Sequence, residues 1–158
     1  MPDSEGDFKK ALRAAYQLLA IRDYSKADLK DKLRRKKFSV SVISRVISEL
    51  EEKNYINDEE YARALVRHCQ KVKRLGLARI CMELKKKALS KDVINKAIEE
   101  YSPELEKLNL TYLIERKTQA GYPRKKIINF LSNRGYPDWE IIKLLGDPDD
   151  RIYEEQTD

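Results

Sequence analysis

The chain has 158 residues, of which 41% are hydrophobic and 38% are charged, and its formal net charge is +6. This length allows one ordinary domain or a few very small ones, and the composition is charge-rich without being that of a disordered chain. The sequence contains no apolar run of about 18 residues, so no transmembrane helix is predicted. The excess of positive charge favours nucleic acid or an acidic partner.

The first seven residues are acidic and lack the apolar core of a signal peptide, so they are expected to form an N-terminal extension of a cytoplasmic protein. A helix is predicted over residues 8–22. Ser25 is then expected to cap a second helix, and Asp28 to return a bond to it in a capping box. A third helix completes a first unit over residues 8–53.

The second predicted unit covers residues 54–101. Asn57 is expected to cap its leading helix, and Glu60, three residues on, to complete a capping box. Gly76 opens the second helix of this unit and Ser90 caps the third. This unit therefore repeats the order of elements in the first.

The third predicted unit covers residues 102–146. Ser102, followed by a proline, marks the start of its leading helix. Pro123 is expected at the first position of the next helix, whereas Pro137 stands where a cap is needed and offers no side-chain acceptor. Residues 147–158 hold six acidic side chains and one basic one. They are expected to form an acidic tail that either solubilises the chain or weakens non-specific binding by mimicking nucleic acid.

The chain resembles itself at a regular interval. The segment from Tyr24 aligns without gaps with the segment from Leu75, 51 residues later, and with the segment from Tyr122, a further 47 residues later. Matching positions hold large apolar residues, and one column is basic throughout, at Lys36, Lys87 and Arg134. Internal periods of about 20–50 residues are typical of repeat architectures. The sequence thus predicts an all-α fold of three tandem three-helix repeats.

The middle helix of each unit is basic. Residues 26–37 hold seven basic and two acidic side chains, residues 77–88 four and one, and residues 124–135 four and none. Each last helix carries one more acid than bases, which is unfavourable for a helix that would enter the major groove. The middle helices are therefore expected to contact phosphates without reading sequence. A solvated face is the alternative, because cations at helix C-termini also interact favourably with the helix dipole.

The residues expected to contact nucleic acid or a protein filament are Lys30, Arg34, Arg35, Lys36, Lys37, Arg79, Lys85, Lys86, Lys87, Arg124, Lys125, Lys126 and Arg134.

Catalytic patterns are not recognisable in the sequence. His68 is the single histidine, and the five glycines form no phosphate-binding loop. Glu83-Leu84-Lys85 has the form of a nuclease-like motif but lies inside a helical repeat. Cys69 and Cys81 are expected to be reduced packing thiols rather than a disulfide or metal site. No enzymatic activity, cofactor or metal is therefore expected.

Taken together, these features resemble the RecX family of recombination regulators over about residues 8–146. The most specific segments are Arg22-Asp23-Tyr24-Ser25, Tyr55-Ile56-Asn57-Asp58-Glu59-Glu60-Tyr61-Ala62 and Arg134-Gly135-Tyr136. Ala88 stands where the family commonly has glycine. The resemblance implies an elongated, curved monomer that binds the RecA recombinase filament on DNA and inhibits its ATP hydrolysis and strand exchange. It also implies sequence-independent contact with single- and double-stranded DNA, and no membrane partner.

Two other interpretations stay open at this point. One is a non-specific DNA-binding protein of helix-turn-helix type, which acts without a protein partner. The other is a helical-repeat scaffold for protein interactions, in which the basic faces are only solvated.

Overall fold

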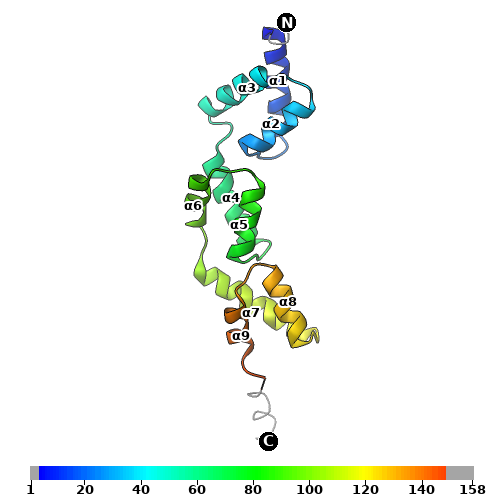
Figure 1. Ribbon diagram of the computed structural model, residues 1–158, viewed down its shortest axis with the longest axis vertical. Coiled ribbons are helices and arrows are strands. Elements are labelled where there is room, and N and C mark those ends of the chain that lie inside the picture. The colour runs from blue at the N-terminus through cyan, green and yellow to red at the C-terminus, as the bar shows by residue number, and fades with distance from the viewer. Residues whose placement is uncertain (1–3, 149–158) are drawn as a thin grey trace, which may run out of the picture. The chain divides into compact units, whose positions relative to one another are not determined.

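The structure is a computed structural model that describes residues 4–148, so the predicted acidic tail lies outside the described residues except for its first two positions. Nine helices follow one another in this part of the chain, and no strand occurs in it (Figure 1). The all-α prediction is confirmed. The helices are α1 (Glu5–Leu19), α2 (Lys26–Arg35), α3 (Val40–Glu52), α4 (Asp58–Lys71), α5 (Leu77–Lys86), α6 (Lys91–Ile98), α7 (Pro103–Gln119), α8 (Arg124–Asn133) and α9 (Asp138–Leu145).

The described chain forms two compact units. Unit 1 comprises the described residues up to Leu65 together with Leu84–Ile98, and unit 2 comprises Val66–Glu83 and the described residues from Glu99 onward. Helices α4 and α5 each contribute residues to both units. The elongation and curvature implied by the family resemblance stay predictions.

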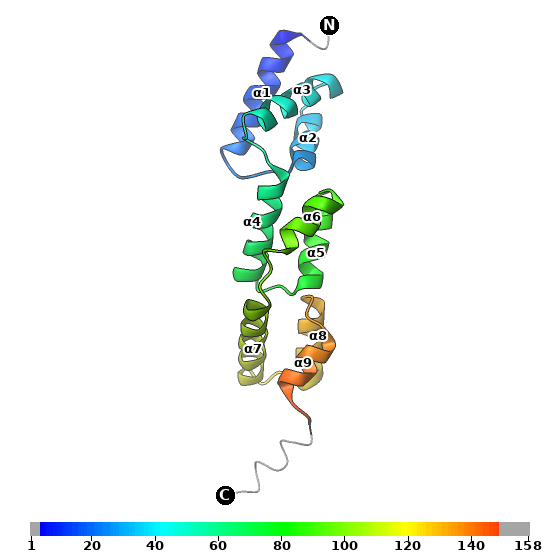
Figure 2. The ribbon, with the colours of Figure 1, turned by 90° about the vertical axis from the view of Figure 1, so that its left-hand side faces the viewer.

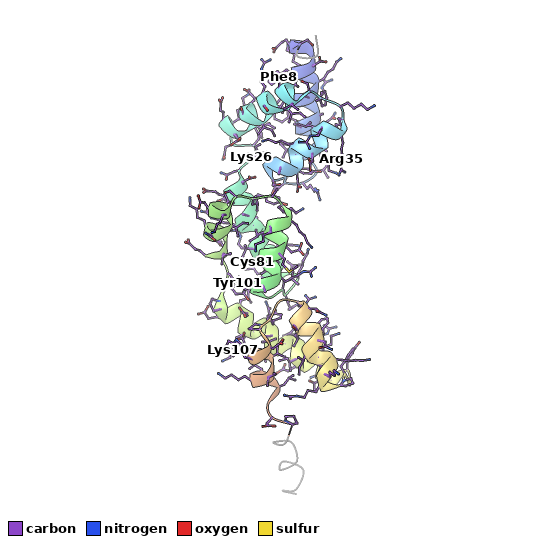
Figure 3. All side chains as sticks on the ribbon, viewed as in Figure 1. Phe8, Lys26, Arg35, Cys81, Tyr101 and Lys107 are labelled. Atoms are coloured by element: carbon purple, nitrogen blue, oxygen red, sulfur yellow. The ribbon has the colours of Figure 1, made fainter. Side chains whose placement is uncertain are left out.

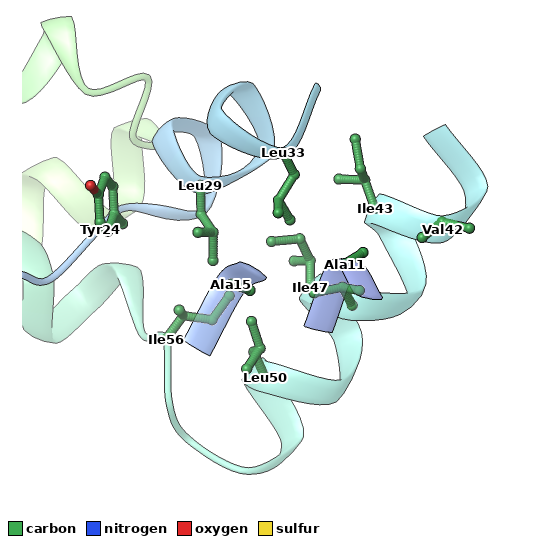
Figure 4. Packing of buried hydrophobic residues seen from close by; sticks show 11 residues of the cluster. Ala11, Ala15, Tyr24, Leu29, Leu33, Val42, Ile43, Ile47, Leu50 and Ile56 are labelled. Carbon is green, nitrogen blue, oxygen red and sulfur yellow. The ribbon is translucent and has the colours of Figure 1, made fainter. Parts of the chain in front are cut away.

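The core of unit 1 is built by α1, α2 and α3, which pack against one another (Figure 2). Leu29 and Leu33, four residues apart on α2, point toward α3 and are fully buried (Figure 4). Ala11 and Ala15 supply the small face of α1 in the same cluster. Complete burial of a leucine side chain contributes about 1.5–3 kcal/mol to folding. The apolar spacing along these helices therefore accounts for their packing.

The first turns of these helices follow the predicted capping chemistry, with two corrections. The Ser25 hydroxyl accepts a hydrogen bond from Asp28 N at 3.2 Å, as expected of an N-cap. The Asp28 carboxylate, however, forms an ion pair with Lys87 instead of completing a capping box. Helix α1 spans Glu5–Leu19 rather than residues 8–22, because Ser4 caps it and accepts from Asp7 N.

Helices α7, α8 and α9 pack together in unit 2. Their core contains Leu110 from α7, Ile127 and Leu131 from α8, and Ile141 from α9, all of them buried. Ser102 caps α7 as predicted. Pro123 corrects another expectation: it occupies the cap position of α8 rather than the first helical position, as Pro137 does for α9. Neither proline forms a side-chain cap bond, so these helix starts depend on their packing.

The turn after the middle helix has the same backbone form in all three repeats. Lys37, Ala88 and Gly135 occupy matching positions, and their φ angles are 68°, 51° and 93°. This left-handed region costs a residue with a Cβ roughly 1–2 kcal/mol. The repeats thus share a strained turn, which glycine relieves in the third copy alone.

Candidate nucleic-acid interface

The predicted basic residues of the first repeat gather at the C-terminal end of α2. Arg34, Arg35, Lys36 and Lys37 are all exposed there, and Lys30 is half-buried. Figure 3 labels Arg35 among them. Arg34 forms an ion pair with Asp31 at 2.9 Å, in which both side chains are mostly exposed. Such a pair contributes little to stability and leaves the guanidinium accessible. The end of α2 therefore presents a compact group of cations, which interact favourably with the negative end of the helix dipole.

The second repeat exposes two of its four predicted basic residues and half-buries the other two. Lys85 and Lys86 are exposed in the last turn of α5, whereas Lys87 is half-buried. Arg79, nearer the start of α5, forms an ion pair with Glu83 at 3.2 Å. Of the four bases predicted in this repeat, the two at the end of the helix thus match the first repeat.

The third repeat places its exposed cations differently. Lys125 and Lys126 are exposed in the first turn of α8, and its last turn contains no basic residue. Arg124 donates to the carbonyl oxygen of Gly146 at 2.7 Å, and Arg134 lies in the turn after the helix. Cations at a helix N-terminus are disfavoured by the dipole. The dipole alternative considered for the other repeats therefore does not account for Lys125 and Lys126.

Two of the three aligned basic residues, Lys87 and Arg134, bind residues of the preceding repeat and so help to join the repeats. In unit 1, Lys87 Nζ lies 3.3 Å from the carboxylate of Asp28, and the Ser25 hydroxyl donates to the Lys87 carbonyl oxygen at 3.4 Å. Asp58 of α4 also accepts a bond from Lys26 N at 2.9 Å. Burial disfavours the charge of Lys87, but Tyr61 and Asp28 outweigh it, so the pKa of Lys87 is raised.

The corresponding joint in unit 2 depends on close backbone approach. Gly76 N donates to the Arg134 carbonyl oxygen at 2.8 Å. Gly76 and Arg134 occupy the same repeat columns as Ser25 and Lys87, so the two joints are equivalent. The Arg134 guanidinium bonds to the carbonyl oxygen of Lys73, and Tyr136 donates to that of Arg74 at 2.7 Å. Lys87 and Arg134 thus have structural partners within these joints.

A buried polar side chain, that of Gln70 in α4, joins α4 to the start of α7 in unit 2. The Gln70 side chain is 2% exposed, donates to the Ser102 carbonyl oxygen at 2.7 Å and accepts from Ser102 N at 3.0 Å. Asn109 in turn donates to the Gln70 carbonyl oxygen at 2.8 Å. Each of these bonds satisfies a group that would otherwise be buried at a cost of roughly 1–3 kcal/mol. They fix the start of α7 against the end of α4.

Sequence reasoning missed a set of aromatic and basic side chains in unit 2, where Tyr112, Tyr122 and Phe130 lie under Arg74, Arg116 and Lys117. The i,i+4 spacing of Tyr112 and Arg116 was the available signal. The contribution of Arg74, from a distant segment, could not be read from spacing.

Expectations from the sequence also concern the cysteines, the histidine, and membrane or metal sites. Cys69 and Cys81 are free, the first buried and the second half-buried. His68 is exposed on α4. In residues 4–148, no helix is long and apolar enough to cross a bilayer, and no group of three potential metal ligands occurs.

The fold defines an all-α protein of tandem three-helix repeats. Residues 11–50 match the family model described as the first three-helix domain of RecX, and residues 57–98 match that of the second. The regulatory protein RecX of Prosthecochloris aestuarii is 33% identical over 144 residues, which cover 90% of this chain and 95% of the relative. That of Caldanaerobacter subterraneus is 30% identical, covering 87% and 70%. The chain belongs to the RecX family of regulatory proteins.

Solved structures show the same fold. The crystal structure of RecX from Lactobacillus salivarius superposes with a TM-score of 0.78 at 24% identity, covering 96% of this chain and 97% of that one. A second crystal structure of a regulatory protein RecX gives a TM-score of 0.74 at 18% identity, covering 85% and 69%. These structures share the fold, and the family prediction from sequence motifs is confirmed by the family models and the relatives described above.

Proposed function

We propose that this protein binds the RecA recombinase filament assembled on DNA and inhibits its ATP hydrolysis and strand exchange. The observation that carries the proposal is the family relationship, which extends over 90% of the chain. The protein is thereby a RecX-type regulator of recombination, and the filament is the partner that its family implies. We further propose that it acts as a cytoplasmic monomer.

The exposed cations support a role for DNA in this binding. The end of α2, the end of α5 and the start of α8 each present exposed lysine or arginine side chains. Lysine and arginine attract phosphates irrespective of base sequence, on single or double strands, and their contribution falls with added salt. Contacts from several linked sites also combine, because each bound site raises the effective concentration of the next. Modest contacts in each of the three repeats would thus together suffice for binding to the filament on DNA.

The proposal is tested by DNA-dependent ATP hydrolysis. The cognate recombinase is assembled on single-stranded DNA, the full chain is added at increasing concentration, and hydrolysis and strand exchange are followed. We expect both to fall at protein concentrations below that of the recombinase. Unchanged hydrolysis and strand exchange at saturating protein would refute the proposal.

A sequence-reading DNA-binding role is less well supported by the same residues. The last helix of each repeat would be the reading helix of a helix-turn-helix protein, yet α3, α6 and α9 with their flanking residues carry more acids than bases. Selection from random duplex oligonucleotides tests the sequence-reading role, because a protein that contacts only phosphates enriches no sequence. We expect no enriched sequence.

A further inference from the structure

Three aromatic rings and four cations form a cluster in unit 2, which we call the cation–aromatic cluster. Lys117 Nζ lies 4.4 Å from the centre of the Tyr122 ring and 4.3 Å from that of Phe130. The Arg74 guanidinium lies 4.2 Å from the centre of the Tyr112 ring. The members of the cluster are Tyr112, Tyr122, Phe130, Arg74, Arg116, Lys117 and Arg134.

Three chain segments build this cluster. Tyr112 and Arg116 are four apart on α7, and Arg116 Nη1 donates to the Tyr112 hydroxyl at 2.7 Å. Phe130 and Arg134 have the same spacing at the end of α8, and the Arg134 guanidinium lies 5.4 Å from the Phe130 ring centre. Arg74 comes from the segment between α4 and α5. Because the bonds of Arg134 to the carbonyl oxygens of Lys73 and Arg74 join these segments, the cluster is held in place before any ligand binds.

Acidic side chains of the described residues do not neutralise the charge of the cluster. Arg74, Arg116 and Lys117 lie over aromatic rings and form no ion pair with an acidic residue among positions 4–148. Hydrogen bonding from Arg116, together with its charge, lowers the pKa of the exposed Tyr112 hydroxyl. Such a local excess of positive charge attracts an anionic ligand.

Two hollows in the surface flank Phe130 and Arg134. One, of about 400 Å³, is lined by Arg116, Lys117 and Tyr122, and the other, of about 370 Å³, by Lys73 and Arg79. Among the described residues that line the two hollows, Glu83 is the single acid, and it pairs with Arg79. Tyr112 and Tyr122 are 37% and 46% exposed, so parts of both rings face solvent. The surface therefore offers positive charge and exposed aromatic carbon together.

We propose that the cation–aromatic cluster binds single-stranded nucleic acid, with phosphates at Arg116 and Lys117 and a base stacked on Tyr122. Single strands combine backbone charge with unpaired bases, and base–aromatic stacking is tolerant of sequence. A duplex conceals the faces of its bases, and an acidic peptide need not supply a planar ring. The inference rests on the proposed function for its biological setting, and it assigns the phosphate contacts to Arg116 and Lys117 of α7, outside the middle helices.

Binding is measured with the full chain and no recombinase, by fluorescence anisotropy of a labelled thymidine oligonucleotide. We expect Arg116→Glu/Lys117→Glu to weaken binding by more than tenfold, and Tyr122→Leu to weaken it about tenfold because the stacking surface is lost. Tyr122→Phe retains the ring and should bind like the parent. The matched control is Lys9→Glu/Lys10→Glu, which makes the same charge change on exposed positions of α1, the leading helix of the first repeat. Circular dichroism verifies that each variant is folded.

A cross-linking experiment on the unaltered protein requires no substitution. An oligonucleotide containing 5-iodouracil is irradiated with the protein, and the modified peptide is identified by mass spectrometry. We expect the adduct on Tyr122 or Tyr112. Adducts confined to other residues, normal binding by Tyr122→Leu, or equal competition by duplex DNA or polyglutamate would each overturn the proposal. If the unaltered protein binds the oligonucleotide as expected but does not inhibit ATP hydrolysis by the recombinase, the proposed function alone is contradicted.

Discussion

Lys87 Nζ lies 3.3 Å from Oδ2 of Asp28, although 59 residues separate the two along the chain. Their side chains are 31% and 29% exposed, so the pair is partly shielded from water. The same turn accepts a hydrogen bond from Ser25, the cap of α2. A basic residue that the repeat pattern places on a contact face thus fastens the second repeat to the first.

Neutralising this pair should reveal a measurable coupling. In a double-mutant cycle with Asp28→Asn and Lys87→Met, followed by urea unfolding, we expect a coupling free energy of about 0.5–1 kcal/mol. The same cycle on Asp31 and Arg34, whose ion pair is mostly exposed, should give a value near zero. Equal coupling in the two cycles would show that burial at the joint has no effect.

The glycines of unit 2 allow a sharper comparison. A Cβ at Gly135 would lie 2.3 Å from Arg79 N, so Gly135→Ala combines a backbone clash with a φ of 93°. Gly121 has a φ of 79° but no atom within 4 Å of an added Cβ. We expect Gly121→Ala to cost about 1–2 kcal/mol and Gly135→Ala clearly more, as measured by chemical denaturation. Similar losses for the two would contradict the close approach.

The proposed filament contact predicts a charge effect. Arg34→Glu, Lys86→Glu and Lys126→Glu together alter one exposed cation in each repeat. We expect this triple variant to bind the recombinase filament more weakly and with a flatter dependence on salt, because fewer counterions are released. Filament binding is measured by co-sedimentation over a range of salt concentrations.

The control for this triple variant changes charge equally elsewhere. Lys9→Glu, Lys10→Glu and Lys91→Glu lie outside the middle helices and are exposed. The variant that carries these three substitutions should retain most of its binding to the recombinase filament. If both variants lose affinity alike, net charge rather than these contact residues governs the interaction.

The raised pKa of Glu140 leads us to expect that the stability of unit 2 depends on pH. Burial first, and then the hydrogen bond and negative charge of Glu106, raise the pKa of Glu140, while Lys143 and Lys107 lower it. An acid whose pKa is raised on folding binds its proton more tightly in the folded state. Its contribution is therefore full below the unfolded value near 4.5 and is lost as the pH rises through the folded value.

Thermal unfolding over this pH range tests the effect. Glu140→Gln removes the titration and retains a donor toward Glu106, so the decline in melting temperature above pH 4.5 should become shallower. Glu104→Gln is the control, since Glu104 is an exposed acid on the same helix as Glu106. An unchanged pH profile in the Glu140 variant would contradict the assignment.

The sequence was sufficient to predict the helical class and the capping by Ser25, Asn57, Ser90 and Ser102, because these depend on local chemistry and periodicity. It was insufficient for the partners of Lys87 and Arg134. Helical periodicity indicates the face on which a side chain lies, but it does not identify the residue that meets that face from another repeat. The cation–aromatic cluster was missed for the same reason, since Arg74 comes from outside the third repeat.

The division of α4 and α5 between two compact units has a consequence for the ancestry of the chain. If the repeats arose by gene duplication, the copied segment is no longer the segment that packs as a body. Deleting the middle copy, residues 54–101, would remove residues 54–65 and Leu84–Ile98 from unit 1, and Val66–Glu83 with residues 99–101 from unit 2. Shortened relatives that lack it would therefore need compensating substitutions on both sides of the deletion.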